Sequence, residues 1–324
     1  MFTVIIPLFN KAAYIEKAIH SVLSQTFQEF ELIVVDDGST DITPLPPNRG
    51  FKDFRLECLE LLGDRARFIH QENQGVSTAR NNGVKLAKYD YIAFLDADDW
   101  WEPTYLKEIK GLIEGYPEAG IYGSSYYIVK NGQKRLATIG VETDFEMGII
   151  NYFRVYAKTL CMPLTSISVI ISKTIFESEN GFKPTLKLGE DFDLWVKVAN
   201  NYPVALLNKP LANYNQDVEL QYRAIGQKLY EPQEHMLFTD YGDLMNDADF
   251  RYLFEALALY GLLPYYISGK NKIEVSKILK TIQWKHHAFK YRMYYLILPR
   301  KIVRLWFWLM SMASHIKNSK RIRL

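Results

Sequence analysis

The sequence predicts an α/β protein with a central, mostly parallel sheet flanked by helices and with a helical C-terminal extension. Its first third alternates short apolar runs with helical patterns, at the spacing of strand, helix, strand units. Acidic residues directly follow two of the expected strands. The 324 residues are 48% hydrophobic and 23% charged, which is typical of a globular chain with one large or two modest domains. Disordered, collagen-like and simple coiled-coil proteins are therefore excluded.

The expected elements follow from the apolar pattern of each segment. We expect early strands over residues 3–7, 30–35, 67–71 and 91–95, and helices over 14–25 and 76–87. Three prolines between 44 and 47 predict a loop, and a possible helix over 54–62 completes an insertion. Further strands are expected over 120–129 and 166–172, a helix over 194–199 just after an acidic cluster, and helical structure throughout 227–282.

Charge and cysteine content indicate the compartment. Residues 1–274 carry 27 basic and 37 acidic side chains, whereas residues 275–324 carry 12 basic and no acidic ones. Cys58 and Cys161 form no Cys-x-x-Cys or Cys/His cluster, so neither a disulfide framework nor a zinc module is indicated. Residues 1–7 predict a buried strand instead of a signal peptide, and no run of about 18 uncharged apolar residues occurs. We expect a cytoplasmic protein without a conventional transmembrane span.

Two carboxylates end the second expected strand. Asp36 and Asp37 begin the turn 36–41 (DDGSTD), and their oxygens are suited to accept hydrogen bonds from a nucleobase or from ribose hydroxyls. Gly38 lets the chain turn close to a ligand. An Asp-rich turn that only caps the next helix explains this segment equally well when it is taken alone.

An Asp-x-Asp pattern follows the strand expected over 91–95. In an extended chain Asp96 and Asp98 project to the same side and can share one site. Two hard oxygen ligands suit Mg²⁺ or Mn²⁺, with water and a substrate diphosphate in the other positions. A solvated acidic loop is the alternative, because an isolated Asp-x-Asp is a weak pattern.

A third acidic cluster precedes the helix expected over 194–199. Asp191 is suited to act as a general base that takes a proton from an attacking hydroxyl, and Glu190 to position the acceptor or Asp191 itself. The same acids need no catalytic role if they only cap the helix, and in isolation capping is the simpler explanation.

Taken in order, these segments resemble the inverting family 2 glycosyltransferases, over roughly residues 2–215. The matching segments are 4–10 (VIIPLFN), 21–26 (SVLSQT), 36–41 (DDGSTD), 75–81 (GVSTARN), 96–99 (DADD) and 189–191 (GED). The resemblance implies a GT-A fold, with a catalytic domain over 1–222 divided near residue 100 into a nucleotide-binding half and an acceptor-binding half. The helical remainder, 223–324, lies outside the resemblance.

The resemblance also implies the roles of residues on the donor side. Pro7, Phe9 and Asn10 would line the base pocket, and Asp37, with Asp36, would hold the base or the ribose. The donor would be a nucleoside-diphosphate sugar, with uracil the favoured base, and the enzyme would add a single sugar during cell-surface polysaccharide biosynthesis.

At the reacting centre, Asp96 and Asp98 would flank the diphosphate, with Asp98 the favoured direct ligand of Mn²⁺ or Mg²⁺. Asp191 would activate the acceptor hydroxyl for attack at the anomeric carbon, with inversion. Arg80 would face the nucleotide or the diphosphate, or pair with a nearby Asp, and the sequence does not choose between these roles.

Two departures from the family pattern limit the assignment. Tyr214 is followed by Asn215 and Gln216, where many relatives have Tyr-Arg and a nearby His that clamp the diphosphate. The Gln-x-x-Arg-Trp of processive polymerases is absent, which argues against a cellulose- or chitin-like synthase.

The tail over 285–324 interleaves basic residues with Trp, Tyr and Leu. This composition suits an interfacial helix on an anionic membrane, where a glycan or lipid-linked acceptor would lie, and so predicts a peripheral protein at the inner face of the cytoplasmic membrane. Packing of the aromatic stripe on the catalytic domain or on a second subunit is the alternative. Nucleic-acid binding is the poorest option because the acidic body opposes it. His286 and His287 are expected at the surface.

Other function classes fit less well. A sugar-1-phosphate nucleotidyltransferase needs a Gly-rich basic loop after the first strand, which residues 9–13 do not provide. A dehydrogenase needs a Gly-x-Gly-x-x-Gly after an early strand, and none occurs. A membrane-docked scaffold with a decayed transferase site is the non-enzyme alternative, and the intact acidic clusters argue against it.

Overall fold

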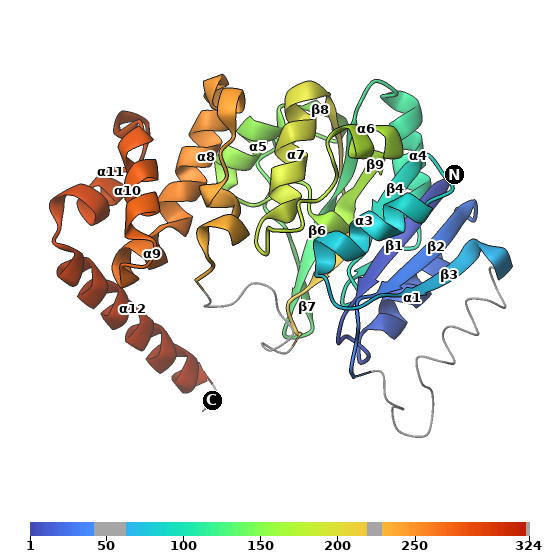
Figure 1. Ribbon diagram of the computed structural model, residues 1–324, viewed down its shortest axis with the longest axis horizontal. Coiled ribbons are helices and arrows are strands. Elements are labelled where there is room, and N and C mark those ends of the chain that lie inside the picture. The colour runs from blue at the N-terminus through green and yellow to red at the C-terminus, as the bar shows by residue number, and fades with distance from the viewer. Residues whose placement is uncertain (42–62, 219–228, 322–324) are drawn as a thin grey trace. The chain divides into compact units, whose positions relative to one another are not determined.

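The computed structural model describes residues 1–41, 63–218 and 229–321, with side chains described up to residue 310 (Figure 1). Two compact units are present: Met1–Gly226 with Glu234–Met236, and Gln227–Gln233 with Leu237–Leu324. The possible helix over 54–62 and Cys58 lie outside the described residues. Cys161 is a free thiol.

The first unit is built on one mixed sheet, to which the described residues contribute ten strands. They are β1 (Phe2–Leu8), β2 (Phe30–Asp36), β3 (Ala66–His70), β4 (Tyr91–Phe94), β5 (Trp100–Trp101), β6 (Ile121–Lys130), β7 (Gln133–Leu136), β8 (Met147–Ile150), β9 (Val169–Ser172) and β10 (Val204–Asn215). The order is β3-β2-β1-β4-β9-β6-β10-β5, with β7 beside β6 and β8 beside β10. The early strands β3, β2, β1 and β4 pair in parallel, whereas β9 runs antiparallel to both β4 and β6.

Helices cover the sheet, as predicted. They are α1 (Ile15–Leu23), α3 (Val76–Leu86), α4 (Tyr105–Gly115), α5 (Tyr152–Thr159), α6 (Lys173–Ser178) and α7 (Glu190–Asn201). The connection through α1 leads from β1 outward to β2, and the one through α3 leads from β3 back across to β4. Because right-handed crossovers in opposite directions place their helices on opposite faces, α1 and α3 cover different faces of the sheet (Figure 1). All seven residues of β1 are buried, which accounts for its continuous apolar run.

The parallel strands bring four loops to one edge of the sheet. The loops that follow β1, β2, β3 and β4 all leave from the carboxyl ends of these strands. The direction of the strand order reverses at β1, which lies between β2 and β4. In open α/β sheets ligands bind at such a reversal, so the fold itself directs attention to the loops after β1 and β4.

The second unit is helical. Its helices are α8 (Ala248–Gly261), α9 (Leu263–Ser268), α10 (Lys272–Thr281), α11 (Phe289–Arg292), a π-helical turn over Met293–Ile297, and α12 (Arg300–Arg321). The expectation of helix throughout 227–282 is wrong for residues 229–247, where only short 3-10 turns occur. Asp240 accepts a hydrogen bond from the N–H of Gly242 there, which competes with a continuous helix, and Asp247 caps the start of α8 by accepting the N–H of Phe250. None of the described helices has the length and apolar character of a membrane span.

His287 is not at the surface, contrary to expectation. Its side chain is 4% exposed, and its Nε2 lies 2.7 Å from a carboxylate oxygen of Glu255 in α8. The ring also stacks on Tyr252, with centroids 5.1 Å apart. The partner lies 32 residues upstream, so the local pattern around His287 gives no sign of it.

Candidate active site

The turn after β2 is organised by Asp37. This carboxylate is buried and accepts hydrogen bonds from the side chain of Gln71 (2.7 Å) and from the backbone N–H groups of Gln74 and Gly75 (both 2.8 Å). Asp37 thereby connects the turn after β2 to the loop that leads into α3. Asp36 lies at the end of β2 and accepts a hydrogen bond from the N–H of Ser39, with His70 2.9 Å away.

Gly38 is required by the backbone of this turn. Its φ is +76°, and an added Cβ would lie 2.9 Å from the backbone nitrogen of Asn73. In this structure the close approach at Gly38 is to the protein's own backbone at Asn73. We expect Gly38→Ala to lower the free energy of unfolding by about 2 kcal/mol or more, because the left-handed conformation costs about 1–2 kcal/mol and the clash adds to it.

Urea denaturation measures this loss, and Gly132→Ala is the matched control. Gly132 has a similar φ of +71° but nothing within 4 Å of an added Cβ, so it carries the conformational cost alone. Equal losses in the two variants would contradict the proposed close approach at Gly38.

The loop after β1 lies against the same turn. Asn10 has a φ of +50°, its Oδ1 accepts a hydrogen bond from the N–H of Thr40 (2.8 Å), and its own N–H donates to Ser39 Oγ (3.1 Å). Pro7 is buried within β1, whereas Phe9 is 45% exposed at the strand's end. An exposed ring at this edge is available to stack against a flat ligand.

The acidic segment after β4 is not extended, which corrects the expectation. β4 ends at Phe94, and residues 96–99 form a turn in which the N–H of Asp99 donates to the carbonyl of Asp96 (3.0 Å). Both predicted carboxylates nevertheless reach solvent, with side chains 31% exposed at Asp96 and 19% at Asp98. Asp98 pairs with Lys11 from the loop after β1.

Arg80 joins two of the predicted clusters. From α3, this buried guanidinium lies 2.6 Å from Asp96 and 3.1 Å from Glu190 at the start of α7. The structure thus shows Arg80 paired with carboxylates, one of the roles that the sequence left open. Although burial by itself lowers the pKa of Arg80, the charges of Asp96 and Glu190 raise it above its usual value. Arg80 is therefore permanently charged and holds the two segments together.

Asp191 lies in the first turn of α7, beside this bridge. The helix begins at Glu190, so the acidic cluster is inside the helix and Gly189 occupies the N-cap position. Burial, together with the negative charge of Glu190, raises the pKa of Asp191 to about 7. Its Oδ1 accepts the N–H of Phe192 (2.8 Å). A carboxylate with a pKa near neutrality is suited to accept a proton from a hydroxyl.

The sequence patterns gave no role in the site to Lys11, to Asn215 or to Asp99 individually. Lys11 pairs with Asp98, and Asp99 is buried and accepts the N–H of Asn215 at the end of β10 (2.6 Å). Asn215 therefore ties the end of β10 to the acidic turn through its backbone. Asp99 is distinguished by its burial in a turn whose other carboxylates reach solvent. Burial depends on tertiary packing and cannot be read from the sequence.

The donor set suits a divalent cation that also binds phosphate. Burial and the charge of Asp96 raise the pKa of Asp98, although Lys11 opposes this. Mg²⁺ and Mn²⁺ are commonly held by one or two carboxylates with phosphate and water completing the shell. Asp96 and Asp98 fit that pattern, while no group of three or more His, Cys, Asp or Glu suited to a metal occurs in the described part of the chain.

Comparison with known proteins decides the family. The model for glycosyl transferase family 2 matches residues 3–167. The chain belongs to this family. The match contains the turns after β2 and β4 described above, and ends before α7.

Relatives and solved structures agree with this assignment. An uncharacterized glycosyltransferase of Rickettsia felis is 32% identical over 210 residues, which is 65% of this chain and 32% of the relative. Glycosyltransferase GlyA of Streptococcus pneumoniae is 36% identical over 125 residues, covering 39% of this chain and 16% of the relative. The chain thus spans about a third or less of the length of these two proteins.

The fold is that of known family structures. The structure of S. aureus TarS residues 1–349 in complex with UDP-GlcNAc matches with a TM-score of 0.60 at 20% identity, covering 86% of this chain and 79% of that one. A likeness at this identity establishes a shared fold. It agrees with the GT-A architecture expected from the sequence.

Proposed function

We propose that this family 2 chain is an inverting glycosyltransferase that moves one sugar from a nucleoside-diphosphate sugar to a hydroxyl of a glycan or lipid-linked acceptor. The observation that supports this most directly is the bridge from Asp96 through Arg80 to Glu190. It sets the expected diphosphate-binding turn beside the expected base, Asp191. The catalytic domain would be residues 1–222, with the nucleotide half over about 1–100 and the acceptor half over about 101–222.

On the donor side, the loops after β1 and β2 would bind the nucleoside. Phe9 offers an exposed ring beside the end of β1, in which Pro7 is buried, and Asn10 shapes the loop that follows. Asp36 and Asp37 hold the turn that would face base and ribose. A UDP-sugar is the favoured donor, and the TarS complexes with UDP and UDP-GlcNAc support this choice for the shared fold.

At the reacting centre, Asp96 and Asp98 would hold Mn²⁺ or Mg²⁺, which when bound neutralises charge that develops on the leaving diphosphate. Lys11 lies beside Asp98 and adds a second positive charge there. Asp191 would take the proton of the acceptor hydroxyl as its oxygen bonds to the anomeric carbon and the bond to the diphosphate breaks. Attack opposite the leaving group inverts the anomeric configuration.

Glu190 positions the acceptor end of the site. It is paired with Arg80, and its charge contributes to the raised pKa of Asp191. Burial is the main cause that raises the pKa values of Tyr152 and Tyr156 in α5. The nearby charge of Asp191 raises these pKa values further. Two buried tyrosine rings of α5 therefore lie near the expected base.

Calorimetric binding of UDP, GDP and dTDP, each with and without Mn²⁺, tests the donor assignment. We expect one nucleotide to bind in a metal-dependent manner, and Asp98→Asn to weaken that binding at least about tenfold because a charged ligand oxygen is lost. Asp144→Asn, an exposed acid outside the site, is the control. No binding of any nucleotide would favour a scaffold with a decayed site.

The second unit would place the enzyme at an anionic membrane, at the inner face of the cytoplasmic membrane. Phe289, Leu305, Trp306 and Trp308 are each more than half exposed, and the basic residues of this segment lie between Phe289 and Leu305: Lys290, Arg292, Arg300, Lys301 and Arg304. Such a surface enters the headgroup layer and is attracted by acidic lipids. The fraction of protein that co-sediments with anionic vesicles should fall as the salt concentration rises. Equally strong binding to neutral vesicles would contradict the proposed attraction by acidic lipids.

A further inference from the structure

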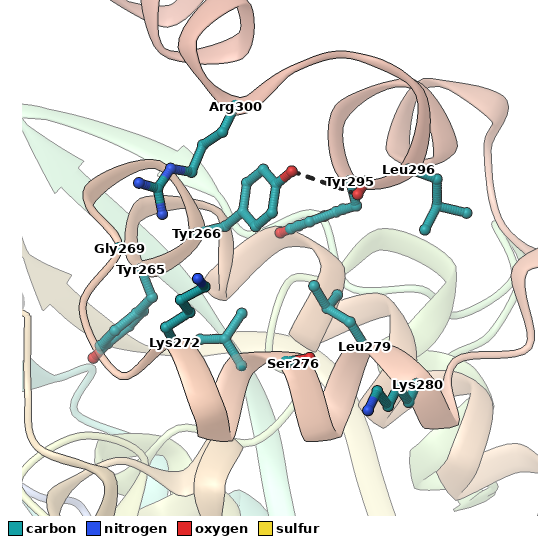
Figure 2. Close-up of a pocket in the computed structure, with 11 residues that line it drawn as sticks. Tyr265, Tyr266, Gly269, Lys272, Ser276, Leu279, Lys280, Tyr295, Leu296 and Arg300 are labelled. Carbon is teal, nitrogen blue, oxygen red and sulfur yellow. Dashed lines mark hydrogen bonds between the residues drawn. The ribbon is translucent and has the colours of Figure 1, made fainter.

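A pocket of about 300 Å³ lies within the second unit, between α9, α10 and the segment that leads into α12 (Figure 2). Its floor is apolar, since Tyr265, Val275 and Tyr295 are buried there and Leu279 closes one side. The volume is at the lower end of the range of about 300–1,000 Å³ found for ligand pockets. It suits a head group with the first part of an apolar chain.

The rim of this pocket carries only positive charge. Lys272, Lys280 and Arg300 line it, and no acidic residue does. Within the described residues none of the three has an ion-pair partner, whereas the nearby Lys270 pairs with Glu231 at 2.9 Å. Figure 2 shows Arg300 and Lys272 reaching toward the same side of the pocket. Three exposed cations over an apolar floor are complementary to an anion on a hydrophobic chain.

The aromatic residues of the pocket are not arranged for a nucleobase. Tyr266 and Tyr295 pack edge to face on one another, with centroids 4.9 Å apart and planes at 65°, and the Tyr266 hydroxyl donates to the carbonyl of Tyr295. Their rings therefore do not form a parallel slot into which a flat base could slide. Leu296 lines the pocket and is also 59% exposed, so the apolar lining continues onto the surface beside Ile297.

We propose that this pocket binds the head of a single lipid phosphate, with the phosphate at Lys272 and Arg300 and the start of the chain over Val275 and Leu279. A phosphate monoester carries nearly two negative charges at neutral pH and accepts several charge-assisted hydrogen bonds. The chain leaves along Leu296 toward the apolar surface. All residues that line this pocket belong to the second unit, whereas those of the proposed nucleotide site belong to the first, so the proposal does not rest on the transfer reaction.

Calorimetry with dihexanoyl phosphatidic acid, kept below its micelle concentration, tests the proposal on the full chain. We expect one molecule to bind, and Lys272→Gln/Arg300→Gln to weaken it at least about 30-fold because two charge-assisted contacts are lost. Lys285→Gln/Lys290→Gln, which removes two exposed cations outside the pocket, should change the affinity by less than about twofold.

Three further probes separate the sources of binding. Inorganic phosphate that binds as tightly as the lipid would overturn the proposal, because the apolar floor would then contribute nothing. Dihexanoyl phosphatidylcholine that binds as tightly would overturn it too, because charge would not be recognised. Displacement of the lipid by UDP would place it in the nucleotide site instead. If the double variant does not fold, Lys272→Gln alone should weaken binding about tenfold, and an unchanged affinity would refute the assignment.

Discussion

Asp191→Asn should reduce sugar transfer by about 10³-fold while nucleotide binding stays within about twofold. The amide has nearly the same shape as the carboxyl group but cannot accept the proton of the acceptor hydroxyl. Asp37, Asp96 and Asp98, the residues proposed to bind the donor, lie on other elements and are not altered. Initial rates with the donor identified by calorimetry measure the loss, and full activity would remove Asp191 from the mechanism.

The pH dependence gives a second readout of the same base. Burial and Glu190 raise the pKa of Asp191 to about 7, so the proton-accepting form predominates only above that pH. The kcat/KM of the wild-type chain should therefore rise about tenfold per pH unit below 7 and level off above it. The residual activity of Asp191→Asn should lack this break, while the exposed control Asp144→Asn keeps it.

Arg80→Gln should lower the free energy of unfolding by about 3–5 kcal/mol, because it leaves Asp96 and Glu190 without their buried cation. The side chains of Arg80 and Glu190 are 3% and 15% exposed, so water compensates the lost charge poorly at Glu190, whereas Asp96 is 31% exposed and better solvated. Urea denaturation at neutral pH measures this.

Lys158→Gln is the matched control for Arg80. Lys158 pairs with Glu142 at 2.8 Å, but the two side chains are 50% and 79% exposed. Such a surface pair contributes less than about 1 kcal/mol. A loss of similar size at both positions would mean that the Arg80 bridge does not hold the two halves of the site together.

The local chemistry of the first hundred residues was predictable. A buried parallel strand needs apolar side chains on both faces, so β1, β2 and β4 each stand out as a run, and the turns that follow them carry Asp and Gly. The family resemblance extended this to the base candidate Asp191. The structure brings Asp96 and Glu190 together through one side chain, that of Arg80.

The interpretation of residues 96–99 shows where a local argument fails. In an extended chain, alternating side chains would place Asp96 and Asp98 on the same side, where they could share a site. Residues 96–99 instead form a turn. Both side chains still lie at the site because Arg80, from helix α3, and Lys11, from the loop after β1, pair with them. Partners on distant segments cannot be inferred from spacing within one segment.

The second unit was the least predictable part of the chain. Outside the family match, its composition indicated helices and a basic aromatic surface. The ion pair of His287 with Glu255 and the pocket under Lys272 and Arg300 depend on how those helices pack. Neither feature has a sequence motif.

By itself the sequence determined the α/β architecture, the family and the strands whose ends carry acidic residues. These properties follow from apolar periodicity and turn residues, which are visible within a few neighbouring positions. Only the tertiary structure decided which charges meet: Arg80 with Asp96 and Glu190, and Lys11 with Asp98. It also raised the pKa of Asp191 to about 7. Burial and the distance between charges set these properties, and both arise only when segments far apart in the chain pack together.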